Sequence, residues 1–284
     1  MNARWSWPVM GSTASLAIPS AGPANRLEPL VAEVRALLAD LEERFSPFLA
    51  DSELNRLREG RLAEDEPSED MREVVSAVAA LQATTGGAFH PFDRLGRFDP
   101  TGYVKGWAIE RAMGLLISAG VTDASLGVGG DLQTIGRSGT TRATERPWRV
   151  AIADPRDPAH VVAIVGAPGP GPFAVATSGN AQRGEHIWPA PPETGHRTVH
   201  AQGSVTAGRP RPQARGPASI TVIGPELRLA DAFATAIWSG ALTGGLDDAW
   251  AWLGGTGYEA LSVDVRGTVR TTAGMADLLV RPAA

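Results

Sequence analysis

The sequence predicts an α+β fold, with flanking helices and mixed or antiparallel sheets. Apolar residues recur with a helical period in some segments, and short apolar runs bounded by Gly and Pro indicate strands in others. The two kinds of segment are mixed without strict alternation, as in α+β proteins. The chain has 284 residues, of which 43% are hydrophobic, so it can bury a large core. No repeat or shift in composition divides it, and we expect one domain over residues 1–284.

The first part of the chain is predicted to hold one strand, three helices and a short buried strand. The opening strand spans Trp5–Ile18. Leucines and valines at helical spacing predict a helix over Leu27–Phe45. A second helix starts after Ser68 with an acidic first turn and ends before two glycines. A third helix is expected from about Gly106 to Gly120, and a strand over Ala124–Val128.

The second part is predicted to be rich in strands. Gly179–Pro217 abounds in Gly, Pro, Arg and His and is long for a loop in a compact domain, so we expect a functional loop or an insertion there. The remaining elements are strands at Trp148–Ala153, Val161–Val165, Phe173–Thr177 and Ala218–Ile223, helices at Leu229–Leu242 and Leu246–Leu253, and a closing hairpin of Tyr258–Asp264 with Gly267–Thr272.

Composition excludes several classes of protein. The net charge is -5, which argues against a nucleic-acid binder. Without cysteine the chain has no disulfide, thiolate nucleophile or Cys-ligated metal. No apolar run reaches the roughly 20 residues of a membrane span. Met1–Met10 lacks the pattern of a secretory signal, so we expect a soluble, cytoplasmic protein without membrane insertion.

The single lysine is the first candidate for a functional residue. Of the 26 basic residues all but Lys105 are arginine, which indicates a position where a compact ammonium is needed. Asp99 and Lys105 flank a Gly-containing turn that is predicted to lead into a helix. A helix N-terminus suits phosphate or carbonyl oxygens, although the same segment could be a simple helix cap with an ion pair.

Two further segments carry groups that could do chemistry. Asp231 and Thr235 are four residues apart on a predicted helix, and together they offer the hard oxygen ligands that Mg²⁺ prefers. The alternative is an ordinary aspartate near a helix N-terminus. Thr177 lies in a Thr-Ser-Gly sequence at a strand end, where hydroxyls can surround an anion, and His186 follows it as a possible general base or a structural histidine.

Taken in order, short segments along almost the whole chain resemble the ApbE family of FAD:protein FMN transferases. They are Met10-Gly11-Ser12, Phe45-Ser46, Asp51 to Leu54, Thr85 to Phe89, Asp99 to Gly106, Gly127 to Asp131, Pro147 to Val150, Thr177-Ser178-Gly179, His186-Ile187, and Ala230 to Ala236.

The resemblance implies an α+β fold of two closely associated subdomains. It also implies Mg²⁺-dependent transfer of FMN from FAD to a Thr or Ser hydroxyl of a target flavoprotein, with release of AMP. The expected acceptor sequence is Asp-x-x-[Ser/Thr]-Gly-Ala-[Thr/Ser]. A non-catalytic FAD-binding protein and a metal-dependent FAD pyrophosphatase are the alternatives.

The resemblance also assigns roles to individual residues. His186 is expected to be the catalytic base, and Gly102, through its carbonyl, is expected to bind the metal with Asp231 and Thr235. His90 stands where the family usually has Asp. The residues expected to contact FAD are Met10, Phe48, Ala88, Phe89, His90, Asp99, Lys105, Thr177 and Ile187.

Overall fold

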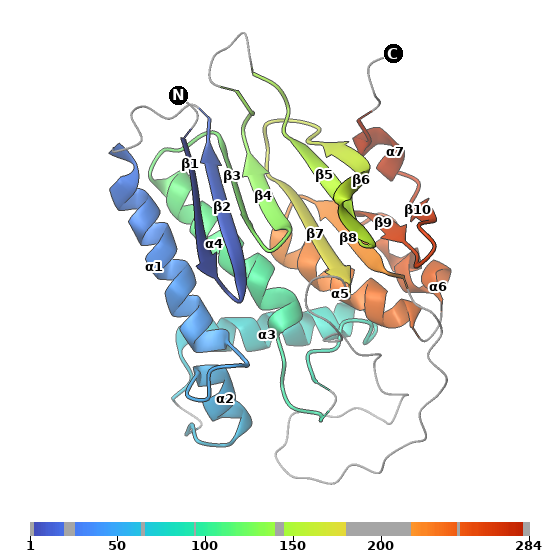
Figure 1. The fold of residues 1–284 in the computed structure, drawn as a ribbon. Coiled ribbons are helices and arrows are strands. Elements are labelled where there is room, and N and C mark those ends of the chain that lie inside the picture. Colours follow the sequence, from blue (N-terminus) through green and yellow to red (C-terminus); the bar gives the residue numbers. More distant parts are fainter. Residues whose placement is uncertain are drawn as a thin grey trace.

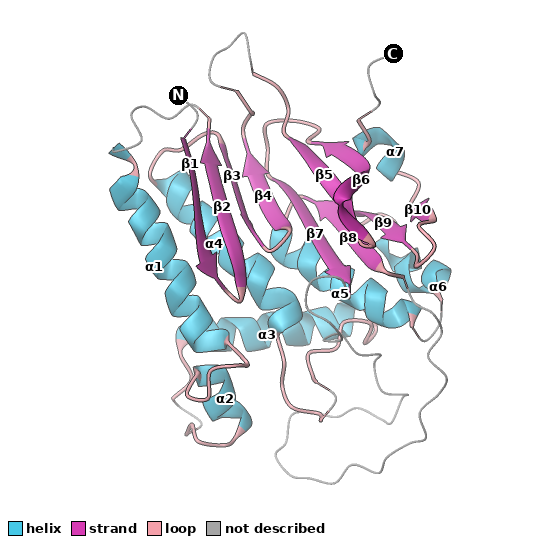
Figure 2. Ribbon diagram, in the orientation of Figure 1, coloured by secondary structure: helices cyan, strands magenta, loops and turns pink. Residues whose placement is uncertain are grey.

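The fold is built on one eight-stranded antiparallel sheet, in the order β1-β2-β3-β4-β7-β8-β9-β10 (Figures 1 and 2). The computed structural model describes residues 3–19, 26–63, 66–93, 95–139, 145–179, 217–242 and 245–280. The strands of this sheet are β1 (Ala3–Val9), β2 (Ser12–Ile18), β3 (Ala124–Val128), β4 (Asp131–Ile135), β7 (Phe173–Gly179), β8 (Ser219–Gly224), β9 (Glu259–Val263) and β10 (Val269–Thr271).

Helices α1 to α6 cover one face of the sheet, and a separate hairpin, with the short helix α7 beside it, covers part of the other (Figure 2). This hairpin consists of β5 (Arg149–Asp154) and β6 (Asp157–Gly166). The helices are α1 (Glu28–Phe45), α2 (Glu53–Arg58), α3 (Glu69–Thr84), α4 (Thr101–Ser118), α5 (Leu227–Ala241), α6 (Leu246–Trp250) and α7 (Met275–Leu278), and a 3₁₀ turn, Ala251–Leu253, follows α6. The α+β class is thus confirmed.

Alternation along β7 shows how the two faces are separated. Ala174 and Ala176 are buried in the core beneath the helices, whereas Phe173 and Val175 are buried in the core beneath the hairpin. Successive side chains of a strand point to opposite faces, so a strand buried on both sides must be apolar throughout. The sheet therefore separates two hydrophobic cores.

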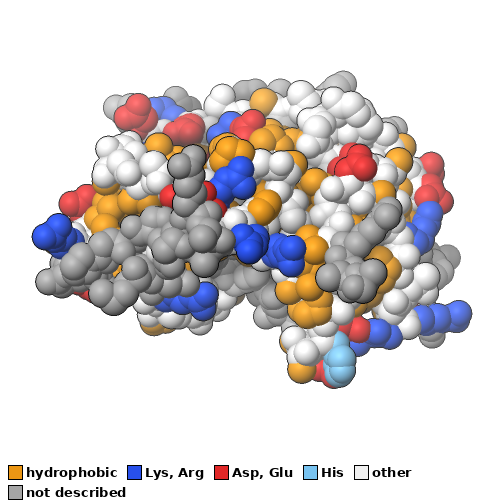
Figure 3. All heavy atoms as spheres, turned by 90° about the horizontal axis from the view of Figure 1, so that it is seen from above, with side chains coloured by type: hydrophobic (Ala, Val, Ile, Leu, Met, Phe, Trp, Pro, Cys, Tyr) orange, Lys and Arg blue, Asp and Glu red, His pale blue; other side chains and the backbone are white. Residues whose placement is uncertain are grey.

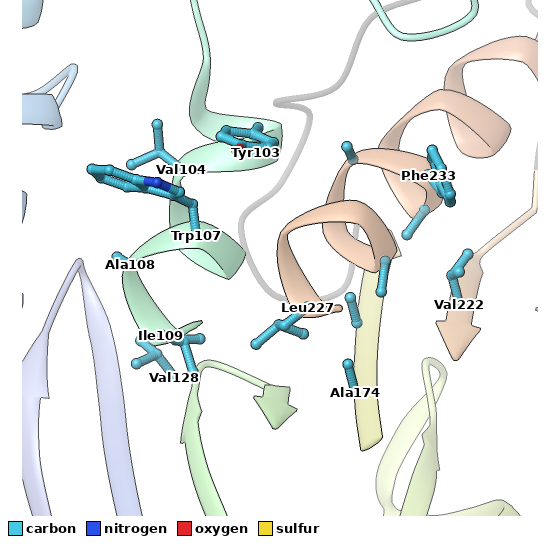
Figure 4. Close-up of a cluster of buried hydrophobic side chains, with 14 of the residues drawn as sticks. Tyr103, Val104, Trp107, Ala108, Ile109, Val128, Ala174, Val222, Leu227 and Phe233 are labelled. Carbon is cyan, nitrogen blue, oxygen red and sulfur yellow. The ribbon is translucent and has the colours of Figure 1, made fainter. Parts of the chain in front are cut away.

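Two glycines on α4 allow α5 to approach it closely. A Cβ on Gly102 would lie 2.9 Å from the side chain of Thr235, and a Cβ on Gly106 would lie 2.6 Å from the main-chain oxygen of Leu227. Positions four residues apart share one face of a helix, so the glycines form a groove into which the first turns of α5 fit. Figure 4 shows Leu227 at the start of α5 directed toward α4, where Trp107 and Ile109 are buried.

The predicted strand Trp5–Ile18 is instead the hairpin β1–β2. Its turn is Met10-Gly11, with φ of 53° and 63°. Two consecutive positive φ angles are typical of the tight type I′ turn, which usually carries Asn-Gly. Because Met stands in place of the usual Asn, this turn is not recognisable from the sequence, and the two strands were predicted as one. Met10 is the one non-glycine with positive φ among the described residues.

Helix α4 begins at Thr101, five residues before the predicted start at Gly106. Gly102 resembles a turn glycine in the sequence, but in the structure its lack of a side chain allows the close contact with Thr235. Lys105 therefore lies in the second turn of the helix rather than before it. Strand β4, helix α2 and helix α7 were not predicted, because each is short and lacks a long periodic pattern.

The described part of the chain contains no helix suited to span a membrane. None of its helices is both long and apolar enough to cross a bilayer. On the face drawn in Figure 3, basic and acidic side chains are interspersed with hydrophobic ones. This mixture agrees with the small negative net charge.

Candidate functional site

A cavity of about 310 Å³ lies where the helical layer, the ends of the central strands and the β5–β6 hairpin meet. Its walls come from the loop before α4, the first turns of α4, the ends of β7 and β8, strand β5 and one face of α5. Nine of the thirteen residues that the sequence singled out are among its lining residues, namely Ala88, Phe89, His90, Asp99, Gly102, Lys105, Thr177, Asp231 and Thr235.

The loop that leads into α4 is held in place by Asp99 and Arg58. Asp99 Oδ1 accepts a hydrogen bond from the main-chain N–H of Thr101 at 3.2 Å and lies 3.5 Å from Nη2 of Arg58. The guanidinium of Arg58 is buried, and burial lowers its pKa despite the attraction of Asp99. Asp99 thus fixes the start of α4, and its carboxylate also faces the cavity.

Lys105 forms an ion pair inside the cavity. Its Nζ lies 2.6 Å from Oδ2 of Asp131, the first residue of β4. Asp131 is fully buried, and its Oδ1 accepts the main-chain N–H of Thr177 at 2.8 Å. One carboxylate therefore links α4, β4 and β7. Because the ammonium is partly exposed at the cavity wall, it can also meet an anionic ligand.

The α4–α5 crossing carries three kinds of oxygen donor, namely the carboxylate of Asp231, the hydroxyl of Thr235 and the main-chain carbonyl of Gly102. Asp231 is buried, and its Oδ2 accepts the N–H of Gly106 at 3.0 Å. Thr235 follows one turn later on the cavity side of α5, and its Oγ1 lies 3.2 Å from Oγ of Ser178. In the described part of the chain, no three His, Asp or Glu side chains gather into a metal cluster. A carboxylate, a hydroxyl and a main-chain carbonyl are nevertheless hard oxygen donors, the set that suits Mg²⁺.

Hydroxyl groups line the end of the central strands. Thr177 and Thr221 face each other across β7 and β8, with their Oγ1 atoms 2.9 Å apart. Ser219 lies on the same face, at the start of β8, and lines the cavity. Its hydroxyl is buried and has no hydrogen-bond partner among the described residues. A buried hydroxyl facing a cavity is suited to bind a polar atom of a ligand.

The loop from Ala88 to Phe92 forms an apolar wall of the cavity. Phe89 is buried, and the ring of His90 lies 5.1 Å from that of Phe92, between centroids. Burial lowers the pKa of His90, although a hydrogen bond with the Phe92 main chain opposes the shift. Burial at this wall of the cavity therefore disfavours the charged imidazolium.

Four of the residues expected at the site are not placed in the cavity wall. Met10 is partly buried against the helical core, at the turn between β1 and β2. Phe48 lies between α1 and α2 with 89% of its surface exposed. His186 and Ile187 lie outside the described residues. The expected contacts of all four with FAD or its acceptor stay predictions.

Asp131 and Ser219 belong to the site but were not predicted from the sequence. Asp131 ends the Gly127–Asp131 segment, which could be read as a ligand-binding turn or as a plain tight turn. In the structure the turn between β3 and β4 is Gly129-Gly130, and Asp131 is the first residue of β4. Only the pairing of α4 with the sheet shows that the carboxylate meets Lys105. Ser219 has no local sequence signal, because its position beside Thr177 depends on strand register.

Comparison with known families and structures identifies relatives of this sequence and of its fold. The sequence profile of the ApbE family matches residues 93–261, more than half of the chain. A relative from Rhodobacter capsulatus named FAD:protein FMN transferase is 38% identical over 141 residues. That match covers 50% of this chain and 24% of the relative, so the chain spans about a quarter of the length of that protein.

Solved structures share the fold. The ApbE protein from Thermotoga maritima superposes with a TM-score of 0.74 at 17% identity, covering 99% of this chain and 100% of that one. The flavinyl transferase ApbE from Pseudomonas stutzeri gives 0.71 at 22% identity, covering 99% and 98%. The flavin transferase ApbE from Vibrio cholerae gives 0.68 at 19% identity, covering 98% and 99%.

Proposed function

The chain belongs to the ApbE family, and from that premise we propose that it transfers FMN from FAD to a Ser or Thr hydroxyl of a target protein, releasing AMP. One observation carries the proposal. The close crossing of α4 and α5 brings the ammonium of Lys105 and the oxygen donors of Asp231 and Thr235 to the same cavity. An ammonium beside oxygen ligands for a magnesium ion suits the negatively charged pyrophosphate of FAD.

The reaction exchanges one phosphorus–oxygen bond for another. The acceptor hydroxyl attacks the phosphorus of the FMN half of FAD, the bond to the bridging oxygen breaks, and AMP leaves with that oxygen. The proton of the hydroxyl must pass to a base, a role that we assign to His186. Phosphoryl transfer depends mainly on positioning and on neutralising charge, which Lys105 and the hydroxyls of the cavity support.

The donor set of the α4–α5 crossing fits a magnesium ion. Asp231, Thr235 and the carbonyl of Gly102 would hold it, with further positions open to water and phosphate oxygens. When bound, the ion would offset the negative charge of the pyrophosphate. Asp231 would remain anchored through the Gly106 N–H, so its carboxylate is fixed in direction before any ligand arrives.

The test is incubation of the protein with FAD, Mg²⁺ and a domain bearing the acceptor sequence Asp-x-x-[Ser/Thr]-Gly-Ala-[Thr/Ser]. Mass spectrometry of the intact acceptor should show one added FMN, and AMP should appear in equal amount. The matched control replaces the acceptor hydroxyl residue with Ala and should show no adduct. EDTA should stop the reaction. Release of AMP and free FMN without an adduct would identify a pyrophosphatase, and bound, intact FAD would identify a storage protein.

A further inference from the structure

We propose that Asp131 is a positioning residue that aims the ammonium of Lys105 at the ligand pyrophosphate. The inference rests on the proposed function, which supplies the anionic ligand. It begins from the ion pair of 2.6 Å between Lys105 Nζ and Asp131 Oδ2. A lysine side chain is long and flexible, and holding its head against a fixed carboxylate removes most of that freedom.

The carboxylate of Asp131 is itself fixed. It is fully buried at the start of β4, and its second oxygen accepts the Thr177 N–H at 2.8 Å. A buried carboxylate is stable only when it is paired and hydrogen-bonded, and here both conditions are met. The position of the ammonium is therefore set by a residue of the sheet rather than by its own helix.

The cavity surrounds this pair with groups that would meet the same ligand. Asp99 precedes α4, and Asp231 lines the cavity from α5. Thr177, near the end of β7, donates its N–H to Asp131. Without Asp131 the ammonium would be free to turn toward another carboxylate, since Asp99, Asp154 and Asp231 all line the cavity. Asp131 thus keeps the positive charge at one place and lets Asp231 keep its bond to Gly106.

Asp131→Asn separates the two functions of the carboxylate. The amide oxygen can still accept the Thr177 N–H, but the amide NH₂ cannot bind the ammonium. We expect FAD affinity and the rate of FMN transfer to fall by about 10- to 100-fold, the usual effect of losing a hydrogen bond to a charged group. The thermal midpoint should change no more than in the control Glu110→Gln, which weakens another partly buried pair between α4 and α5, at 2.9 Å to Arg228.

A double-mutant cycle with Lys105→Ala tests whether Asp131 acts through the lysine. We expect Asp131→Asn to have almost no further effect on FAD affinity once Lys105 is absent. A merely structural role would give the same loss in both backgrounds, and that additive result would overturn the proposal. If Asp131→Asn fails to fold, Asp131→Glu serves the same cycle, since it keeps the charge but moves it by one methylene.

The cycle also separates this proposal from the proposed function. A wild-type protein that transfers FMN but gives an additive cycle would contradict the role of Asp131 alone. A wild-type protein that binds FAD with a non-additive cycle but forms no adduct would contradict transferase activity alone. Absence of FAD binding in the wild type would overturn both.

Discussion

Lysine at position 105 is explained by the size of its surroundings. The ammonium reaches Asp131 from the second turn of α4, and the next residue, Gly106, is pressed against the start of α5. A planar guanidinium is larger and presents its donors as a fork. The one lysine of the chain therefore stands where a single compact cation must fit between a buried carboxylate and a ligand.

Replacing this lysine with arginine should be harmful although the charge is kept. We expect Lys105→Arg to lower FAD affinity and FMN transfer by about 10-fold or more, because the fork cannot keep the same contact with Asp131. Isothermal titration with FAD and the adduct assay measure the two quantities. Affinity and turnover equal to those of the wild type would mean that position 105 tolerates any cation.

His90 couples stability to pH. Burial lowers its pKa in the folded protein below the usual value of 6.5, so the unfolded chain binds a proton more readily. The contribution of neutral His90 to the free energy of unfolding is therefore fully present above about pH 6.5. It is lost progressively as the pH falls from there toward the lowered pKa. His90→Gln should lose less of its thermal midpoint than the wild type between pH 7.5 and pH 5.5. Equal losses would show that His90 protonates freely in the folded state.

At the scale of elements, the crossing of α4 and α5 decides whether the site exists. Gly102 and Gly106 bring the helices so close that a main-chain N–H of α4 bonds to a side chain of α5. Glycine lowers helix stability by about 1 kcal/mol relative to alanine. Glycine occurs at these positions inside a helix of 18 residues because it lets α5 pack closely against α4.

Gly106→Ala and Gly114→Ala should therefore have opposite effects, although both raise helix propensity. A Cβ at position 106 would lie 2.6 Å from the Leu227 oxygen, whereas one at 114 meets nothing within 4 Å. We expect Gly106→Ala to destabilise the protein by about 1–3 kcal/mol and to weaken FAD binding. Gly114→Ala should stabilise it by up to about 1 kcal/mol. Urea unfolding measures both, and stabilisation by Gly106→Ala would contradict the close crossing.

The same crossing shows where prediction from sequence stops. The helical period of Leu27–Phe45 and the short apolar runs of the central strands are local signals, so these elements were predicted closely. The start of α4 was misplaced because a glycine within a helix resembles a turn glycine until its neighbour in space is known. The pairing of Lys105 with Asp131 joins residues that are 26 positions apart, and only the fold reveals it.

At the scale of the molecule, the cavity lies between two separately packed layers. The helical layer contributes residues of α4 and α5, and the β5–β6 hairpin contributes residues 150–154 of β5. The hairpin is held to the sheet by a core of its own, in which Ile152 and Val165 pack against Val175 and Val263. Cavity shape thus depends on a core that contains none of the charged site residues.

Loosening that second core should weaken ligand binding from a distance. Val165, on strand β6 of the hairpin, is fully buried and does not line the cavity, whereas Val161 on the same strand is exposed. Val165→Ala should cost about 1–3 kcal/mol of stability through lost burial and an unfilled space. FAD affinity should also fall several-fold, because binding must then restore the position of β5. Val161→Ala, which removes the same atoms from the surface, should leave both quantities near the wild type. If Val165→Ala lowered stability without changing the dissociation constant for FAD, the hairpin would be a passive cover, and the helical layer alone would determine the shape of the binding site.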